Sequence, residues 1–261
     1  MVDSVAASAP DGPRFAIGRA LALSFGVLAR NLGPMAAISL AVTAVQSAVD
    51  YMLSGGTGDD SSNSVSNLIA YALITAPVTY ATFQDLRGTP VGIGSIFSKG
   101  FGIIWRVAGA TIGVVLVAIV PVIGVFFIGL FAGLPLVLLG VLAGIFVLYI
   151  FVVWFVLVPV LVVEDIRFFA GFGRALDLSR GRRWSILGLL LVYGAIIVAI
   201  GAVMLGLVAL FQDSAIVSLV LLIPFGAFYS VIGAILPAVV YYLLRAEKEG
   251  VGIDQIAMVF D

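Results

Sequence analysis

The feature that most constrains this chain is a run of 57 residues, 107–163, without a single charged side chain. A helix crosses the hydrocarbon core of a bilayer with about 20 mostly apolar residues. The run is therefore too long for one crossing and fits two. Glycine and proline cluster at residues 129–135, and this cluster predicts the turn between the two helices.

The composition of the whole chain agrees with a protein that lipid covers. Apolar side chains make up 62% of the 261 residues and charged side chains 10%, whereas a soluble domain averages about 25% charged residues. The alternative is a soluble all-helical protein with an unusually large core, but so few charges could not coat its surface. The net charge of −1, without a basic stripe, predicts no nucleic-acid partner.

Four further apolar segments bring the prediction to six transmembrane helices, arranged as three hairpins in an all-α fold. The segments are residues 32–53, 65–83, 184–211 and 215–244. All 13 basic residues then fall on one side of the membrane, and the loops on the other side hold none. By the positive-inside rule, the basic side is cytoplasmic. We therefore expect a multi-pass protein of the cell inner (plasma) membrane with both termini in the cytoplasm.

The segments before the hairpins have amphipathic patterns. In residues 15–28, Ile17, Leu21 and Phe25 share one helical face and Arg19 lies opposite. Residues 93–101 and 168–176 repeat the pattern. Such short helices lie in the membrane interface, although they could instead pack on cytosolic partner helices.

The amphipathic segments also match one another in sequence. Residues 18–26 and 173–181 are identical at seven of nine positions, and residues 94–102 keep both bounding glycines. The three copies start 76 and 79 residues apart. This spacing predicts a pseudo-threefold repeat with units at about 15–87, 91–167 and 168–245. Together they form one membrane domain, 14–245, between a disordered tail, 1–13, and a cytoplasmic segment, 246–261.

The second helix of each predicted hairpin carries a proline before its cytoplasmic end. These prolines are Pro77, Pro159 and Pro237. Proline removes a backbone hydrogen bond and bends a helix, which membrane helices tolerate when neighbouring groups satisfy the freed carbonyl. We predict helix kinks at all three positions.

Several short stretches resemble the signature of a bacterial membrane family. They include Val163-Glu164-Asp165, the stretch from Gly173 to Trp184, and Tyr241-Tyr242-Leu243-Leu244-Arg245. The family is the membrane domain attached to some glycerophosphoryl diester phosphodiesterases, with its stand-alone YciC-type relatives. The resemblance implies an accessory membrane domain, because the family's phosphodiesterase chemistry belongs to a separate soluble domain that needs histidine and a carboxylate-bound metal.

The residue content excludes several kinds of catalysis. The chain has no cysteine and no histidine, so thiol nucleophiles, disulfides, thiolate or imidazole metal ligands and histidine acid–base catalysis are absent. We predict no catalytic residue, no cofactor and no metal. Asp50, near the outer end of the first span, is either an interfacial acid or a binding point for a cation or headgroup. Glu164 and Asp165 could hold a metal, but ion pairing with nearby arginines is favoured, namely Arg167, Arg182 or Arg183.

Arginines beside the membrane interface are candidates for binding lipid headgroups, because guanidinium groups pair with phosphates in two-pronged geometry. The predicted headgroup residues are Arg19, Arg30, Arg106, Arg174, Arg180, Arg182, Arg183 and Trp184. The alternative is an ordinary positive flank without lipid specificity.

The predicted function is that of a non-enzymatic inner-membrane protein that organises lipid or serves as an accessory or scaffold subunit. Its expected partners are membrane lipids, and either another membrane protein or a second copy of the chain. One alternative is a channel or transporter with a path between the three proline-bent hairpins. Another is an intramembrane enzyme that uses Glu164 and Asp165.

Overall fold

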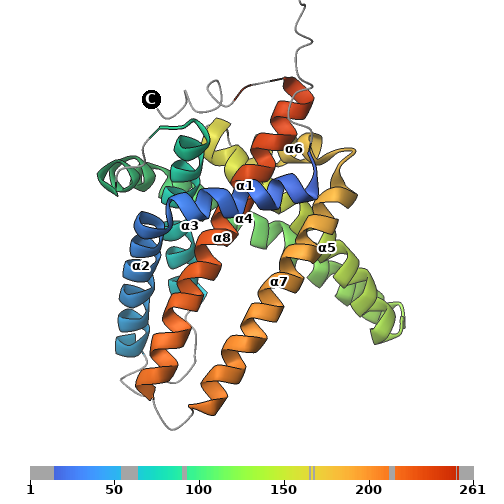
Figure 1. Cartoon of the computed structure of the whole chain (residues 1–261). Helices are drawn as coiled ribbons and strands as arrows, with labels where there is room; N and C mark the ends of the chain where they lie inside the picture. Colours follow the sequence, from blue (N-terminus) through green and yellow to red (C-terminus); the bar gives the residue numbers. More distant parts are fainter. Residues whose placement is uncertain are drawn as a thin grey trace, which may run out of the picture.

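A computed structural model describes residues 15–53, 64–89, 93–164, 166, 168–211, 215–250 and 252. Within these ranges the chain is helical, as predicted (Figure 1). The eight helices are α1 (Ile17–Arg30), α2 (Leu32–Leu53), α3 (Ser64–Leu86), α4 (Ile93–Phe131), α5 (Leu136–Glu164), α6 (Phe168–Ser179), α7 (Arg183–Leu210) and α8 (Ala215–Glu249). The predicted tail, 1–13, and nearly all of the chain after Gly250 lie outside the described residues.

Five of the described helices are long and apolar enough to cross a membrane. The qualifying segments are Leu32–Leu53, Val107–Phe131, Leu136–Glu164, Arg183–Leu210 and Ile223–Glu249. Large apolar side chains stand exposed along them, with Phe131 at 90% and Val137 at 79% of full exposure. Soluble proteins rarely expose contiguous apolar surface on this scale, so these helices indicate a protein embedded in a membrane.

Helix α3, the second of the six predicted spans, is not among the five. It carries Thr75, Thr79 and Thr82, which are buried, and it packs against α2, α4 and α8. Thr82 donates its hydroxyl to the carbonyl of Val78 at 2.8 Å. Because neighbouring helices cover these polar groups, α3 does not need the uniformly apolar sequence of a helix that faces lipid.

The core lies among α3, α5 and α8. Most residues of 70–83, 150–163 and 231–244 are buried. Helix α8 packs against α1, α2, α3, α5, α6 and α7, so it is the central element of the bundle. The rings of Phe83 and Tyr241, both fully buried, meet edge to face with centroids 6.0 Å apart.

Helix α1 lies across α8 rather than along it (Figure 1), at the end of the molecule that also holds α6 and the C-terminal end of α8. Its buried residues are Ala20, Ser24, Val27 and Leu28, a spacing typical of one helical face. Ile17, Leu21 and Phe25 are half-buried against the core. The apolar face of α1 is therefore covered in part by the protein itself.

The three amphipathic segments do not have the same structure. The first and third are separate helices, α1 and α6, as predicted. The second is the beginning of α4, a single helix of 39 residues that continues from Ile93 into the span without a break. Gly181 has φ +83° in the turn after α6, whereas its sequence counterpart Gly26 lies within α1.

The turn predicted at residues 129–135 is confirmed. Helix α4 ends at Phe131 and α5 begins at Leu136. Gly133 has φ +70°, a left-handed conformation that favours glycine. The helices on either side of the turn pack together, as α2 does with α3 and α7 with α8.

Candidate functional site

Charged side chains from three helices meet at the end of α5. Arg174 of α6 donates to Glu164 of α5, with Nε 3.0 Å from Oε2, and also pairs with Glu249 of α8. Arg245 lies 3.0 Å from Glu249 and donates to the hydroxyl of Tyr241 at 2.7 Å. That hydroxyl in turn donates to Glu164 at 3.0 Å. These five residues form what we call the carboxylate–arginine cluster.

The cluster contains two carboxylates and two guanidinium groups, so its formal charges balance. Burial alone would lower the pKa of Arg174, but hydrogen bonds from Arg174 to Glu164 and Glu249 and the two negative charges outweigh burial and raise it. Arg174 therefore stays charged and links α6 to both α5 and α8. This arrangement gives Glu164 a structural role.

Two smaller contacts attach α1 to the same end of the bundle. Glu247 of α8 accepts a hydrogen bond from the backbone N–H of Phe15 at 2.8 Å and pairs with Arg182. Arg30 forms a two-pronged pair with Asp85 of α3, with a closest distance of 2.6 Å. The hydrogen bond to Asp85 raises the pKa of Arg30 against a smaller opposing effect of burial.

The predicted headgroup residues fall into different environments. Arg30, Arg174 and Arg182 are in ion pairs with carboxylates of the protein. Arg183 lies over the ring of Tyr149, with its guanidinium carbon 5.3 Å from the centroid, which is a cation–π contact. Arg19, Arg180 and Trp184 are exposed. The side chain of Arg106 lies outside the described part.

The predicted partners of Glu164 were wrong where the structure describes them. Arg182 pairs with Glu247, and Glu164 pairs with Arg174 and, at 4.0 Å, with Arg245. Asp165 and Arg167 lie outside the described residues. Sequence reasoning also missed Glu249, although its position four residues after Arg245 is the spacing at which ion pairs form on a helix.

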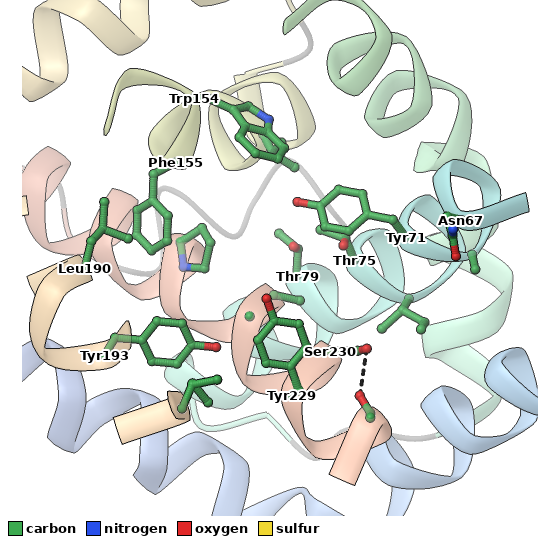
Figure 2. A pocket seen from close by; sticks show the side chains of 18 of the residues that line it. Asn67, Tyr71, Thr75, Thr79, Trp154, Phe155, Leu190, Tyr193, Tyr229 and Ser230 are labelled. Carbon is green, nitrogen blue, oxygen red and sulfur yellow. Dashed lines mark hydrogen bonds between the residues drawn. The ribbon is translucent and has the colours of Figure 1, made fainter. Parts of the chain in front are cut away.

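A cavity of about 560 Å³ lies among α2, α3, α5, α7 and α8. Figure 2 shows aromatic side chains around it, with the hydroxyl groups of Tyr71 and Tyr193 directed toward the space between them. Thr75, Thr79 and Ser230 add further hydroxyl groups. No lining residue among those described is charged.

All three predicted kink prolines lie inside helices: Pro77 in α3, Pro159 in α5 and Pro237 in α8. Pro159 and Pro237 line the cavity. Pro121 and Pro224 also lie within helices, α4 and α8. Two of the three repeated prolines thus border the same internal space.

Two polar groups on the cavity wall have no partner within the described structure. They are the indole N–H of Trp154 and the hydroxyl of Tyr193, and both atoms are buried. Buried polar atoms are nearly always hydrogen-bonded, so these two groups are exceptions that need a partner. A carboxylate oxygen of Asp50 in α2 is likewise buried without a described partner.

Within the described ranges, no cluster of three or more carboxylates is placed to hold a metal ion. Comparisons with protein-family models, with curated proteins and with solved structures find no match to this chain. The fold and the site of the described residues therefore define a class: a helical protein with membrane-length apolar helices, a charged end and a cavity whose described lining is uncharged.

Proposed function

We propose that this chain is a non-enzymatic integral protein of the inner membrane that organises lipid or supports a larger membrane complex. The observation that carries the proposal is that the described arginines lie toward one end of helices whose sides are apolar. The resemblance to the accessory membrane domain of glycerophosphoryl diester phosphodiesterases supports the same role.

The proposed topology has six spans in three hairpins with pseudo-threefold repeats, and both termini in the cytoplasm. In this arrangement α3 crosses the membrane inside the bundle, where α2, α4 and α8 cover its threonines. The segregation of all 13 basic residues supports this orientation, because an arrangement without the α3 crossing would place basic segments on both sides.

The proposed contact with lipid headgroups lies at Arg180, Arg183 and Trp184. Trp184 is 84% exposed and Arg180 is exposed beside the start of α7. Tryptophan and arginine are favoured where a helix meets the membrane surface. Arginines whose charge is already matched by protein carboxylates, such as Arg174, have a structural role in this proposal.

Purification in a mild detergent, followed by lipid mass spectrometry and partner identification, tests the proposal. We expect an anionic phospholipid or a membrane-protein partner to be retained, and a combined Arg180→Ala, Arg183→Ala variant to retain less anionic lipid. The matched control is Arg87→Ala, Lys248→Ala, which removes two basic residues outside the predicted headgroup set. A homogeneous particle with neither specific lipid nor partner contradicts the proposal.

A transport path is the second candidate function. The observation that favours it is the position of Pro159 and Pro237 on a cavity between helices of different hairpins. Solute flux into liposomes that contain the purified protein, lost when Pro159 and Pro237 are replaced by alanine, would support it. Liposomes that stay tight to ions and small neutral solutes count against it.

A further inference from the structure

We propose that the cavity among α2, α3, α5, α7 and α8 binds one neutral lipid whose polar end carries carbonyl oxygens. This inference deepens the proposed lipid-organising function and rests on it. The cavity is separate from the arginines at the cytoplasmic end, so it would be a second lipid site with a different chemistry.

Two side chains that line the cavity carry polar groups without a described partner. An indole N–H can only donate a hydrogen bond, and a tyrosine hydroxyl donates one as well. The N–H of Trp154 and the hydroxyl of Tyr193 are buried and lack a described partner. The indole N–H requires an acceptor on the ligand, and a carbonyl oxygen has two lone pairs, so a carbonyl group also offers an acceptor to the Tyr193 hydroxyl.

The described lining of the cavity also lacks charge. The described lining contains hydroxyl, amide and aromatic side chains but no Asp, Glu, Lys or Arg. An ionised headgroup would lose its hydration here without gaining a counter-charge, which is strongly unfavourable. The lining therefore favours a neutral polar end over a phosphate, an ammonium group or a metal ion.

The volume of the cavity and its mostly apolar wall suit a lipid. The volume of about 560 Å³ falls within the range of roughly 300–1,000 Å³ typical of small-molecule sites. The centroid of the Trp154 ring lies 6.2 Å from that of Tyr71 and 5.6 Å from that of Phe151. Such aromatic and aliphatic surfaces suit an acyl or isoprenoid chain next to a carbonyl group, as in a glycerol ester or a quinone.

Glycines on the wall allow the site to be blocked selectively. Gly194 of α7 lines the cavity, and a Cβ added there meets no atom within 4 Å. Leucine at this position would extend into the cavity and compete with a ligand. Gly206, on the same helix, has the same free space around an added Cβ but is exposed and outside the lining, so Gly206→Leu is a matched control.

A hydroxyl deletion tests the donor argument without changing the shape. Tyr193→Phe removes a hydroxyl that has no described partner, so it should not weaken the ligand-free protein. The affinity of the Tyr193→Phe variant for the ligand should be about 2- to 12-fold lower, which corresponds to the usual contribution of one hydrogen bond. Tyr80→Phe is the control, because that hydroxyl accepts a hydrogen bond from Gln84 at 3.1 Å outside the cavity.

The experiment titrates the purified full chain with dioctanoylglycerol, with a short-chain alkyl benzoquinone and, as the charged probe, with dioctanoyl phosphatidylglycerol. Native mass spectrometry counts bound probe, and thermal unfolding follows the ligand-free variants. We expect one neutral probe to saturate at one molecule per chain, and the one that does so identifies the ester or the quinone as the source of the carbonyl. Gly194→Leu should abolish this binding, and Tyr193→Phe should weaken it.

Three results would overturn the inference. The first is saturation by the charged probe in preference to both neutral probes. The second is neutral-probe binding that Gly194→Leu and Tyr193→Phe leave unchanged. The third is no saturable binding of either neutral probe. If the purified protein still retains endogenous anionic lipid in these cases, only the cavity assignment fails. If it retains no anionic lipid either, the proposed function is contradicted as well.

Discussion

Replacement of Arg174 by alanine should destabilise the packing of α6 against α5 and α8. Arg174 holds Glu164 and Glu249 together, and its side chain is 31% exposed while that of Glu164 is 15% exposed. A hydrogen bond to a charged group contributes about 1.5–3 kcal/mol, whereas an exposed ion pair contributes about 0–1 kcal/mol. The partial exposure of Arg174 places the expected loss at about 2 kcal/mol.

The loss should not be larger, because Glu164 keeps other partners. Tyr241 still donates to it at 3.0 Å and Arg245 remains 4.0 Å away. A carboxylate that was buried and left wholly unpaired would cost about 3–5 kcal/mol. Because Glu164 keeps these contacts, the expected loss of stability stays below that of a carboxylate without any partner.

Unfolding in mixed micelles of increasing sodium dodecyl sulfate content, followed by tryptophan fluorescence, measures the effect. Arg180→Ala is the matched control, since Arg180 is an exposed arginine after the same helix. A double variant with Glu164→Ala should lose less stability than the sum of the two single variants, because both remove the same pair. Equal unfolding of Arg174→Ala and Arg180→Ala would refute the reasoning.

Other substitutions test individual contacts. Glu247→Ala removes the acceptor for the Phe15 N–H and for Arg182, the residue before α7, so α1 and the first turn of α7 should exchange their amide hydrogens faster while α2 does not. Unchanged exchange in α1 would show that Glu247 does not hold α1 in place. Gly181→Ala should cost about 1 kcal/mol, because its φ of +83° is strained for alanine. Gly173→Ala, at the start of the same nine-residue match, should instead stabilise α6 by about 0.5–1 kcal/mol. Gly173 lies within a helix and has free space around an added Cβ. Similar effects of the two substitutions in thermal unfolding would contradict the assigned conformations. Asp85→Ala should destabilise the protein more than Asp177→Ala does, because Asp85 accepts hydrogen bonds from both Arg30 and Asn31. Asp177 is an exposed acid on α6. Equal unfolding of the two variants would exclude a stabilising role for the contact between Arg30 and Asp85.

The helix pattern could be predicted because lipid-facing segments carry a strong local signal. The bounds of α2 coincide with the prediction, and the turn between α4 and α5 falls inside the predicted 129–135. An apolar run interrupted by glycine and proline determines both features without any tertiary contact. The same local reasoning gave α1 and α6 as short amphipathic helices.

Features that depend on tertiary contacts could not be predicted. Nothing in residues 93–107 shows whether an amphipathic segment turns into the next span or continues straight into it, and α4 continues. The pairing of Arg174 with Glu249 joins positions 75 residues apart, which no local spacing indicates. The cavity wall is contributed by five helices, so its residues look like ordinary membrane-helix residues in the sequence.

In the proposed topology, the two ends of the helices lie in different compartments. The chain has no cysteine, so single cysteines can be introduced without background. Leu134→Cys lies in the turn between α4 and α5, and Arg180→Cys lies in the turn between α6 and α7. With a membrane-impermeant maleimide we predict labelling of Leu134→Cys in intact spheroplasts and of Arg180→Cys only after the membrane is opened. Labelling of both cysteines in intact spheroplasts, or of neither until the membrane is opened, would contradict the proposed crossing.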